Sequence, residues 1–404
     1  MLAGKKALLT LKSVSDRVTH DEFLARLAVE YPQAVKEAES FGGIKELVIP
    51  TLIAPEALSL PCALWNEAQR LVSIFHSRIR ENQNEAERLR ALTPALQDPG
   101  HYSVLMSYDF HVDPSGALRL IEINTNASMG AMVDVMNATR GLERARNGFA
   151  LDFQRELGRE LKGARIAIVD DEPSKQKLFA EFLVYKDMLM NCGAEVVIAD
   201  RRELSMRQDH LWCGDFGPID LVYNRATDFY LEENSSLPLR EALAAKATVI
   251  TPSAHEYRLL ADKNRMVRWS EPGALESIGL SADECAVVRR ALIQTREVRG
   301  LDPELLWNER KNLIFKPKNA FGGKAVFRGS SVARGVFQRI LEADGLAQEF
   351  VPAPTVAIGG VEFKYDLRFF AYRDELRTAC ARLYQGQMTN ATTPGGGVTS
   401  VIWT

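Results

Sequence analysis

The chain has 404 residues, of which 46% are hydrophobic and 25% charged, values that are typical of a soluble globular protein with two or three domains. Its 50 Lys and Arg against 53 Asp and Glu give a net charge of −3, which excludes the basic footprint of a protein that binds nucleic acid or an anionic membrane. Five scattered cysteines without a CxxC pair predict reduced thiols and a cytoplasmic location, and no apolar stretch has the length of a transmembrane helix or signal peptide.

Residues 1–100 are predicted to form a helical region. Between 62 and 80, apolar residues recur at intervals of three and four, which places them on one buried helix face. These residues are Leu64, Ala68, Leu71, Phe75 and Ile79. We expect this face to serve core packing and no chemistry.

A hairpin of two strands follows, joined by a Pro-Ser-Gly turn. In its second strand, "LRLIEIN", alternation places Glu122 and Asn124 on one face and Ile121 and Ile123 on the other. Asp109 on the first strand is expected beside Glu122. Two carboxylates and an amide are hard oxygen ligands suited to Mg²⁺ that carries nucleotide phosphates. A solvated polar strand face is the alternative, but the small-residue turn "NTNASMG" would let a ligand approach the backbone and favours a site.

A polar helical segment is predicted at 133–161, and a small parallel α/β unit at 163–252, where short apolar strands alternate with helices. This unit is expected to be a module inserted between two parts of another domain. Asp170 and Asp171 end its first strand, where ligands of such sheets bind, although a helix cap or a solvated loop explains them equally well. The turn "VDDEPS" has no glycine, which argues against an NAD-dependent enzyme.

The last part of the chain carries basic residues beside glycines. Lys316 ends an apolar strand, and Gly322 and Gly323 in the next loop would let backbone N–H groups face an anion. An exposed glycine turn is the alternative, and Lys263 alone would be a surface lysine. The segment "AQEFVP" has the acid and the main-chain groups of an adenine-binding hinge.

Two later strands carry an acid and two arginines. Asp366 and Arg368 share one face of "KYDLRFFAYR", and Arg382 lies on the following strand. Such residues form a structural ion pair or neutralise a transferring phosphoryl group. No Ser/His/Asp or Cys/His set is expected, and neither His101 nor His111 is assigned a catalytic part.

Together these motifs resemble the ATP-grasp superfamily. Asp109-Phe110 followed after thirteen residues by Glu122 and Asn124 is similar to the D-alanine–D-alanine ligase branch, and the order of the motifs is similar to the circularly permuted eukaryotic glutathione synthetases. The resemblance spans about residues 102–400. It is carried by "EINT", "VYNRATDFY", "ITPSAHEYRLLADKNRM", "FKPKNAFGG" and "CARLYQGQMTNATTPGGGVTSV".

The resemblance implies a mixed α/β, circularly permuted ATP-grasp fold in four parts. These are an N-terminal helical region (1–100), a metal-binding hairpin (101–162), an inserted Rossmann-like substrate-binding domain (163–252) and the main nucleotide-binding part (253–404). It also implies an ATP- and Mg²⁺-dependent ligase that joins a small carboxylate to an amine through an acylphosphate. Ligases of this kind are often dimers, so a homodimer is left open.

The resemblance further implies roles for individual residues. The metal ligands would be Asp109, Glu122 and Asn124. Nucleotide-binding residues would be Lys263, Lys316, Lys318, Gly322, Gly323, Gln348, Glu349, Phe350 and Val351. Catalytic roles fall to Arg368 and Arg382, and substrate binding to Arg225, Ser128 and Gly396.

The sequence departs from the glutathione synthetases at three places. Ala320 stands where that family has a metal-binding glutamate, Ser107 replaces a substrate arginine, and a lysine after the final arginine is replaced near Tyr384. We therefore do not expect a glutathione synthetase. The competing hypotheses are a kinase on the same fold and a non-catalytic nucleotide-binding protein.

Overall fold

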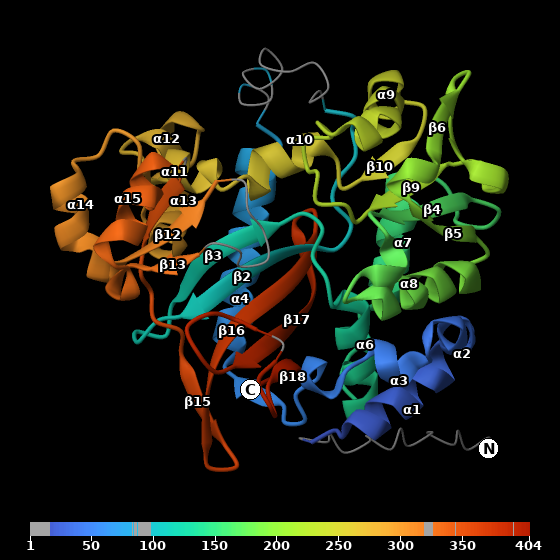
Figure 1. The fold of residues 1–404 in the computed structure, drawn as a ribbon, viewed down its shortest axis with the longest axis horizontal. Coiled ribbons are helices and arrows are strands. Elements are labelled where there is room, and N and C mark those ends of the chain that lie inside the picture. The colour runs from blue at the N-terminus through green and yellow to red at the C-terminus, as the bar shows by residue number, and fades with distance from the viewer. Residues whose placement is uncertain are drawn as a thin grey trace, which may run out of the picture.

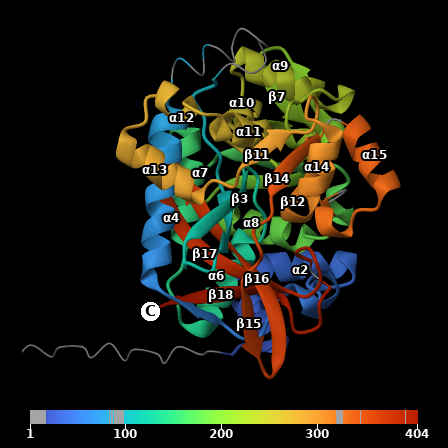
Figure 2. The ribbon, with the colours of Figure 1, turned by 90° about the vertical axis from the view of Figure 1, so that its left-hand side faces the viewer.

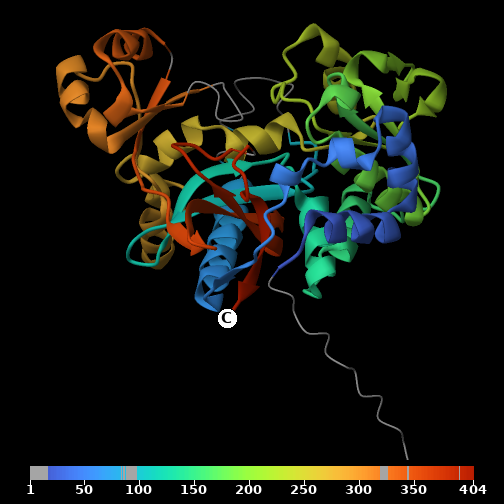
Figure 3. The same cartoon turned by 60° about the horizontal axis from the view of Figure 1, so that its bottom comes forward.

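The computed structural model describes residues 17–82, 84, 87, 98–318, 326–343, 345–390 and 392–404. A central mixed sheet lies between two lobes that contain the smaller sheets (Figures 1 and 3). The first helices are α1 (His20–Glu30), α2 (Pro32–Ala38), α3 (Ile44–Leu47), α4 (Cys62–Ile74), α6 (Gly130–Arg140), α7 (Arg146–Leu157), α8 (Phe179–Asn191) and α9 (Leu237–Ala245). The later helices are α10 (Ala254–Glu256), α11 (Asn264–Ser270), α12 (Ala274–Ser277), α13 (Ala282–Ala291), α14 (Pro303–Glu309) and α15 (Arg334–Glu342).

The central sheet combines strands from both ends of the chain. Its order is β1 (Leu58–Leu60), β18 (Gly397–Trp403), β17 (Glu375–Tyr384), β16 (Val361–Tyr372), β2 (Met106–Val112) and β3 (Leu118–Asn124), with β15 (Thr355–Ile358) also paired to β16. The hairpin β2–β3 is therefore confirmed, and β16 pairs antiparallel to β2 with Arg368 directly opposite Asp109. Residues 259 positions apart in sequence are thus neighbours.

One face of the central sheet is covered by α4, which runs along it in Figure 2. The predicted apolar stripe of this helix is confirmed: its members are at most 5% exposed and pack against residues of β2, β3, β16 and β17. The stripe continues through a π-helical turn, Phe75–Arg80, that extends α4. Because α4 fills this side, the polar side chains of the sheet must face the other.

A β-bulge corrects one detail of the predicted alternation. The register of β2 and β3 shifts between Asp109 and Phe110, so that Glu122 pairs with Asp109 while Leu120 pairs with Phe110. The extra residue is Ile121, which is half-buried and outside the core, whereas Ile123 is buried in it. The two isoleucines therefore do not share a buried face, because a bulge places two residues opposite one.

The predicted parallel unit is present in the second lobe. Its strand order is β10 (Val249–Thr251), β9 (Leu221–Asn224), β4 (Arg165–Asp170) and β5 (Glu195–Asp200), all parallel. Beside it lies a small antiparallel sheet of β6 (Leu204–Arg207), β7 (His210–Cys213) and β8 (Gly217–Pro218). In β4 every residue from Ile166 to Asp170 is buried, as expected for a strand covered on both faces.

The segment 133–161 is helical, but its first half is not polar as predicted. It forms α6 and α7, which are separated at Gly141 by a left-handed backbone (φ 78°). Residues of α6 are almost all buried, including Asp134, whose carboxylate accepts from the backbone N–H groups of Ala145 and Arg146. Asp134 therefore binds the backbone at the start of the next helix.

The other lobe contains an antiparallel sheet in the order β11 (Thr295–Glu297), β14 (Gly345–Glu349), β12 (Leu313–Pro317) and β13 (Phe327–Arg328). Leu313 and Phe315 pack into a core with Phe337 and Ile340 of α15. Because side chains alternate along a strand, Ile314 and Lys316 lie on the opposite face. The register places Gln348 and Arg328 directly beside Ile314 on its two neighbouring strands.

Candidate functional site

A buried ion-pair network lies on the face of the central sheet opposite α4. Asp109 is fully buried, and its Oδ1 and Oδ2 accept hydrogen bonds from Nε (2.8 Å) and Nη2 (2.6 Å) of Arg368. Nη2 of Arg382 donates to the same Oδ2 (2.9 Å), and Nε of Arg382 donates to Asp366 (2.5 Å). The two predicted catalytic arginines are therefore brought together, with Asp109 between them.

The contacts of Asp109 bear on its expected role as a metal ligand, which stays a prediction. Burial opposes ionisation, but Arg368 and Arg382 outweigh it and lower the pKa of Asp109 to about 2. Ser107 adds a hydrogen bond to Oδ1 (3.2 Å). An open metal ligand needs a free oxygen lone pair directed into the site, whereas both Asp109 oxygens are engaged by guanidinium groups. In the structure Asp109 anchors the arginines.

Glu122 and Asn124 are half-buried at the edge of this network. The Asn124 amide nitrogen donates to Asp109 (3.4 Å), which leaves its carbonyl oxygen for another partner. The pKa of Lys316 is lowered overall. Burial is the largest cause, the charge of Glu122 opposes it, and the charge of Lys263 adds to it. Lys316 from one lobe thus shares an electrostatic environment with Glu122 of the central sheet and with Lys263.

Lys263 does not lie within a continuous helix as predicted. It is the N-cap of α11, just after a π-helical turn, Tyr257–Ala261. Lys318 forms an ion pair with Glu297 of β11 (3.2 Å). Gly322 and Gly323, together with Ala320, lie outside the described residues.

The predicted hinge, 348–351, connects β14 to the central sheet. Gln348 is buried and its amide donates to Thr295 Oγ1 (3.1 Å), while Glu349 is exposed. Phe350 donates its backbone N–H to the Asn312 carbonyl (2.7 Å). His111 Nδ1 contacts the Val351 carbonyl (3.0 Å), so this histidine of β2 fastens the hinge to the sheet.

Two of the predicted substrate residues meet at the loop after β3. Nη1 of Arg225 donates to the carbonyls of Asn126 (2.8 Å) and Ala127 (3.1 Å), and Nη1 of Arg368 donates to the Ser128 carbonyl (3.3 Å). The loop therefore joins the end of β9 to the arginine network. Gly396 has a packing role, because a Cβ there would lie 2.6 Å from the Leu383 carbonyl oxygen.

The sequence did not single out Thr389. Its hydroxyl donates to Asp366 Oδ2 (2.5 Å), which ties the loop between β17 and β18 to the carboxylate that holds Arg382. From the same loop, Gln387 reaches Ser331 in the lobe of β12 (3.3 Å). No local signal marks a threonine in a glycine-rich loop as such a contact.

The acids at the end of β4 have different surroundings. Asp171 binds Arg201 through both oxygens (2.8 and 2.9 Å), so its role is structural. Asp170 is 8% exposed, accepts from the Asp171 backbone N–H, and burial raises its pKa to about 6. Asp171 thus forms an ion pair, which is neither the helix cap nor the solvated loop considered from the sequence, and a ligand-binding role of Asp170 stays a prediction.

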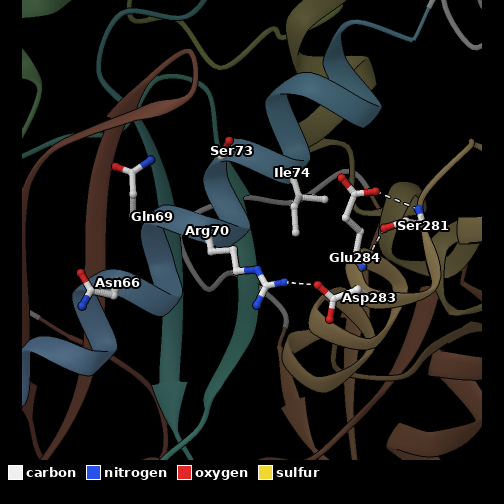
Figure 4. Close-up of a pocket in the computed structure, with 8 residues that line it drawn as sticks. All are labelled: Asn66, Gln69, Arg70, Ser73, Ile74, Ser281, Asp283 and Glu284. Atoms are coloured by element: carbon white, nitrogen blue, oxygen red, sulfur yellow. Dashed lines mark hydrogen bonds and ion pairs between the residues drawn. The ribbon is translucent and has the colours of Figure 1, made fainter.

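A surface cavity of about 550 Å³ lies away from this network, between α4 and α13 (Figure 4). Arg70 pairs with Asp283 across it, and Glu284 caps α13 through Ser281. These contacts hold two helices together and leave no group placed for chemistry.

Two kinds of feature are absent from the described ranges, a ready-made metal cluster and a membrane-crossing helix. No group of three or more His, Cys, Asp or Glu side chains is arranged there to hold a metal ion. No helix in the same ranges combines the length and apolar character needed to cross a bilayer. A protein-only metal cage is therefore absent from the part of the chain that the structure describes.

Comparison with known proteins finds similarity only at the level of structure. No protein-family model matches the chain, and no curated protein matches it in sequence. A glutathione synthetase-like effector from Globodera pallida, solved in its apo form, aligns with 97% of this chain and all of its own, at 11% identity and a TM-score of 0.55. A protein assigned as a gamma-glutamylcysteine synthetase from Methylobacillus flagellatus aligns with 84% of this chain and 86% of its own, at 10% identity and a TM-score of 0.50.

The chain therefore has the mixed α/β fold of glutathione synthetase-like proteins, as the sequence motifs suggested. The alignment with the effector covers nearly the full length of both chains, so the fold is shared as a whole. An identity of 11% shows the fold alone, and the chemistry must be argued from this chain's own residues.

Proposed function

We propose that this protein is an ATP- and Mg²⁺-dependent ligase that joins a small carboxylate to an amine through an acylphosphate. The observation that carries the proposal is the meeting of three charged sets from distant parts of the chain. Lys316 and Lys263 share an electrostatic environment with Glu122, and Glu122 lies directly opposite Asp109, which holds Arg368. The same region thus contains lysines that could bind phosphates, an acid that could bind a metal ion, and guanidinium groups that could bind a carboxylate.

The residues present fit Mg²⁺ bound together with a nucleotide. Mg²⁺ is usually held by one or two protein oxygen ligands plus substrate phosphates and water. Glu122 and the carbonyl oxygen of Asn124 would supply such ligands. When bound, the ion would offset negative charge on the phosphates. Asp109 is left out of this set because its oxygens are engaged.

The chain's own residues account for the remaining steps. Lys263 and Lys316 would bind the phosphates, and main-chain groups of 348–351 would bind the adenine. Arg368 and Arg382 would orient the substrate carboxylate for attack on the γ-phosphate and then stabilise the acylphosphate. An amine entering from the side of the parallel unit would displace phosphate, with the loop at Ser128 lining the path.

The chain order supports a permuted ATP-grasp arrangement. The hairpin β2–β3, which holds Glu122, precedes every element of the nucleotide lobe in sequence yet pairs with β16 near the chain end. The parallel unit lies between these parts in the chain. We therefore propose that the hairpin is a transposed end of the nucleotide-binding domain and that the parallel unit is an insertion that binds substrate.

The proposal is tested by ADP release from the full chain with ATP and Mg²⁺, screened against amino acids, dipeptides and polyamines, with mass spectrometry of the products. An acceptor should stimulate ADP release and gain the mass of the condensed partner. Glu122→Ala should lower the rate at least about 100-fold, as loss of a charge-stabilising group does. Glu304→Ala, at an exposed ion pair on α14, is the matched control and should retain the rate.

Two results would count against the ligase. If no acceptor stimulates ADP release, the condensation step has no support. If hydroxylamine traps an acylphosphate while no amine product forms, the protein is a kinase on this fold. Retained magnesium-dependent ATP turnover in Glu122→Ala would remove the metal-site assignment.

A further inference from the structure

Arg328 shares a strand face with the nucleotide lysine. It lies on β13 directly opposite Ile314 of β12, and residues directly opposite each other in an antiparallel pair point to the same side. Lys316 is two residues beyond Ile314 and therefore has the same orientation. The other face of this sheet packs on α15, so Arg328 and Lys316 both face the inside of the proposed nucleotide site.

The guanidinium group of Arg328 covers the ring of Phe350, with its carbon 3.1 Å from the ring centroid. Phe350 belongs to the predicted hinge. The half-buried Arg328 forms no ion pair within the described ranges, and its Nε is buried without a hydrogen-bond partner. Residues 319–325, which precede it, contain no acid. Burial alone lowers its pKa, which also indicates that no carboxylate compensates this charge.

An uncompensated planar cation on an aromatic ring has a second free face. Guanidinium planes stack on nucleobases, and an aromatic ring behind the guanidinium holds that plane in position. Two other arginines of this lobe cover Trp307, but each has a further partner. Arg334 binds both oxygens of Glu304, and Arg310 donates to the Trp307 carbonyl (2.7 Å). Arg328 is thus arranged for a ligand rather than for a neighbouring acid.

We propose that Arg328 is a nucleotide-binding residue whose guanidinium plane, supported by Phe350, stacks on the purine base. This inference rests on the proposed function, since it requires that the lobe bind a purine nucleotide. It assigns base recognition to β13, whereas the lysines serve the phosphates. The stacking face should therefore matter equally for ADP and ATP, and not at all for a phosphate chain without a base.

The test is calorimetric titration of the full chain with ADP, ATP and tripolyphosphate, with Mg²⁺ present. Arg328→Ala should raise the Kd for ADP and ATP by the same factor of about 10, the size of one stacking contact, and leave tripolyphosphate unchanged. Arg328→Lys keeps the positive charge but loses the planar group, so it should bind ADP and ATP as weakly as Arg328→Ala does. Arg334→Ala, which removes a cation–π pair elsewhere in the lobe, should bind like the wild type.

The outcomes separate this inference from the proposed function. If the wild type binds neither ADP nor ATP, both fail. If it binds them and Arg328→Ala binds equally well, only the role of Arg328 fails. Recovery of affinity in Arg328→Lys, or a loss that includes tripolyphosphate, would show a phosphate contact instead and overturn the base-stacking role. Equal loss in Arg334→Ala would indicate a general disturbance of the lobe and would also overturn it.

Discussion

Replacing Asp109 by asparagine tests whether this carboxylate positions the two arginines for chemistry. The substitution keeps the shape of the side chain but removes the charge between Arg368 and Arg382. Asp109 accepts three guanidinium hydrogen bonds of 2.6 to 2.9 Å at a fully buried position. An asparagine NH₂ group would face at least one of these donors, so the two cations would be pushed apart.

The expected loss of stability follows from the burial of the network. Removing one partner of a buried ion pair costs about 3–5 kcal/mol, because the other charge stays buried without compensation. Arg382 keeps its contact with Asp366, so we expect the lower end, about 3 kcal/mol. Since the pKa of Asp109 is lowered to about 2, the wild type should have this contribution above pH 4 and lose it as the pH falls towards 2.

Stability alone would not distinguish a catalytic network from a structural one, and Asp152 provides the matched control. It is also fully buried and binds Arg377 through both oxygens (2.8 and 2.7 Å), with Arg155 at 3.6 Å, but away from Glu122. Urea unfolding should show a loss in both variants and a smaller one in Asp152→Asn, because burial raises the pKa of Asp152 despite Arg377, whereas the arginines lower the pKa of Asp109. Under conditions where both variants are folded, ADP release should fall only in Asp109→Asn.

Equal retention of turnover in the two variants would refute the reasoning, because the arginines would then act without their anchor. An unchanged stability of Asp109→Asn would refute it at an earlier step, since the network would not be strongly coupled. If turnover falls in both variants, the loss reflects folding and assigns no role to Asp109.

Four further substitutions, one of them a control, probe other parts of the fold. Burial raises the pKa of Glu156 to about 7, so the folded state holds a proton that the unfolded state releases at lower pH. The free energy of unfolding of the wild type should therefore fall by about 3 kcal/mol from pH 4.5 to 7.5. Urea unfolding of Glu156→Gln should lack this fall, and a pH profile identical to that of the wild type would contradict the prediction. In calorimetry, Lys316→Ala should weaken ATP binding at least about 10-fold. Lys318→Ala, which removes an ion pair with Glu297, should weaken ATP binding less. Equal losses of affinity would contradict the different roles given to the two lysines. Thr389→Val should cost about 1 kcal/mol in unfolding free energy and lower kcat more than it raises KM, and a change in KM alone would assign the loop to substrate binding only.

Features encoded by local pattern could be predicted from the sequence. The apolar stripe of α4 and the strands of the parallel unit depend on residue types at fixed spacing, and both were found as expected. The hairpin could also be predicted, because a turn signal joins its two alternating strands. The same alternation placed Glu122 and Asn124 on one strand face, and their role as metal ligands stays a prediction.

Features that depend on pairing between distant segments could not be predicted in this way. Whether Asp109 faces a metal or an arginine depends on which residue of β16 lies beside it, and that residue is 259 positions away. The roles inferred for the hydroxyl of Thr389 and the guanidinium of Arg328 depend on their neighbours in other strands. Even within the hairpin, the bulge at Ile121 has no glycine or other marker in the sequence.

The placement of Asp109 also resolves a question of charge in the proposed site. The positive charge that Arg368 and Arg382 could offer a substrate carboxylate is already balanced, because the two guanidinium groups share Asp109 and Asp366. In the proposed site, Mg²⁺ and two lysines would balance much of the negative charge of the triphosphate. Two further arginines without acidic partners would leave the site with excess positive charge. A network that is neutral in sum but holds rigid N–H donors can still orient a carboxylate by hydrogen bonding. We infer that this protein recognises its acid by geometry more than by net charge, and that Glu122 alone supplies the acid to the metal.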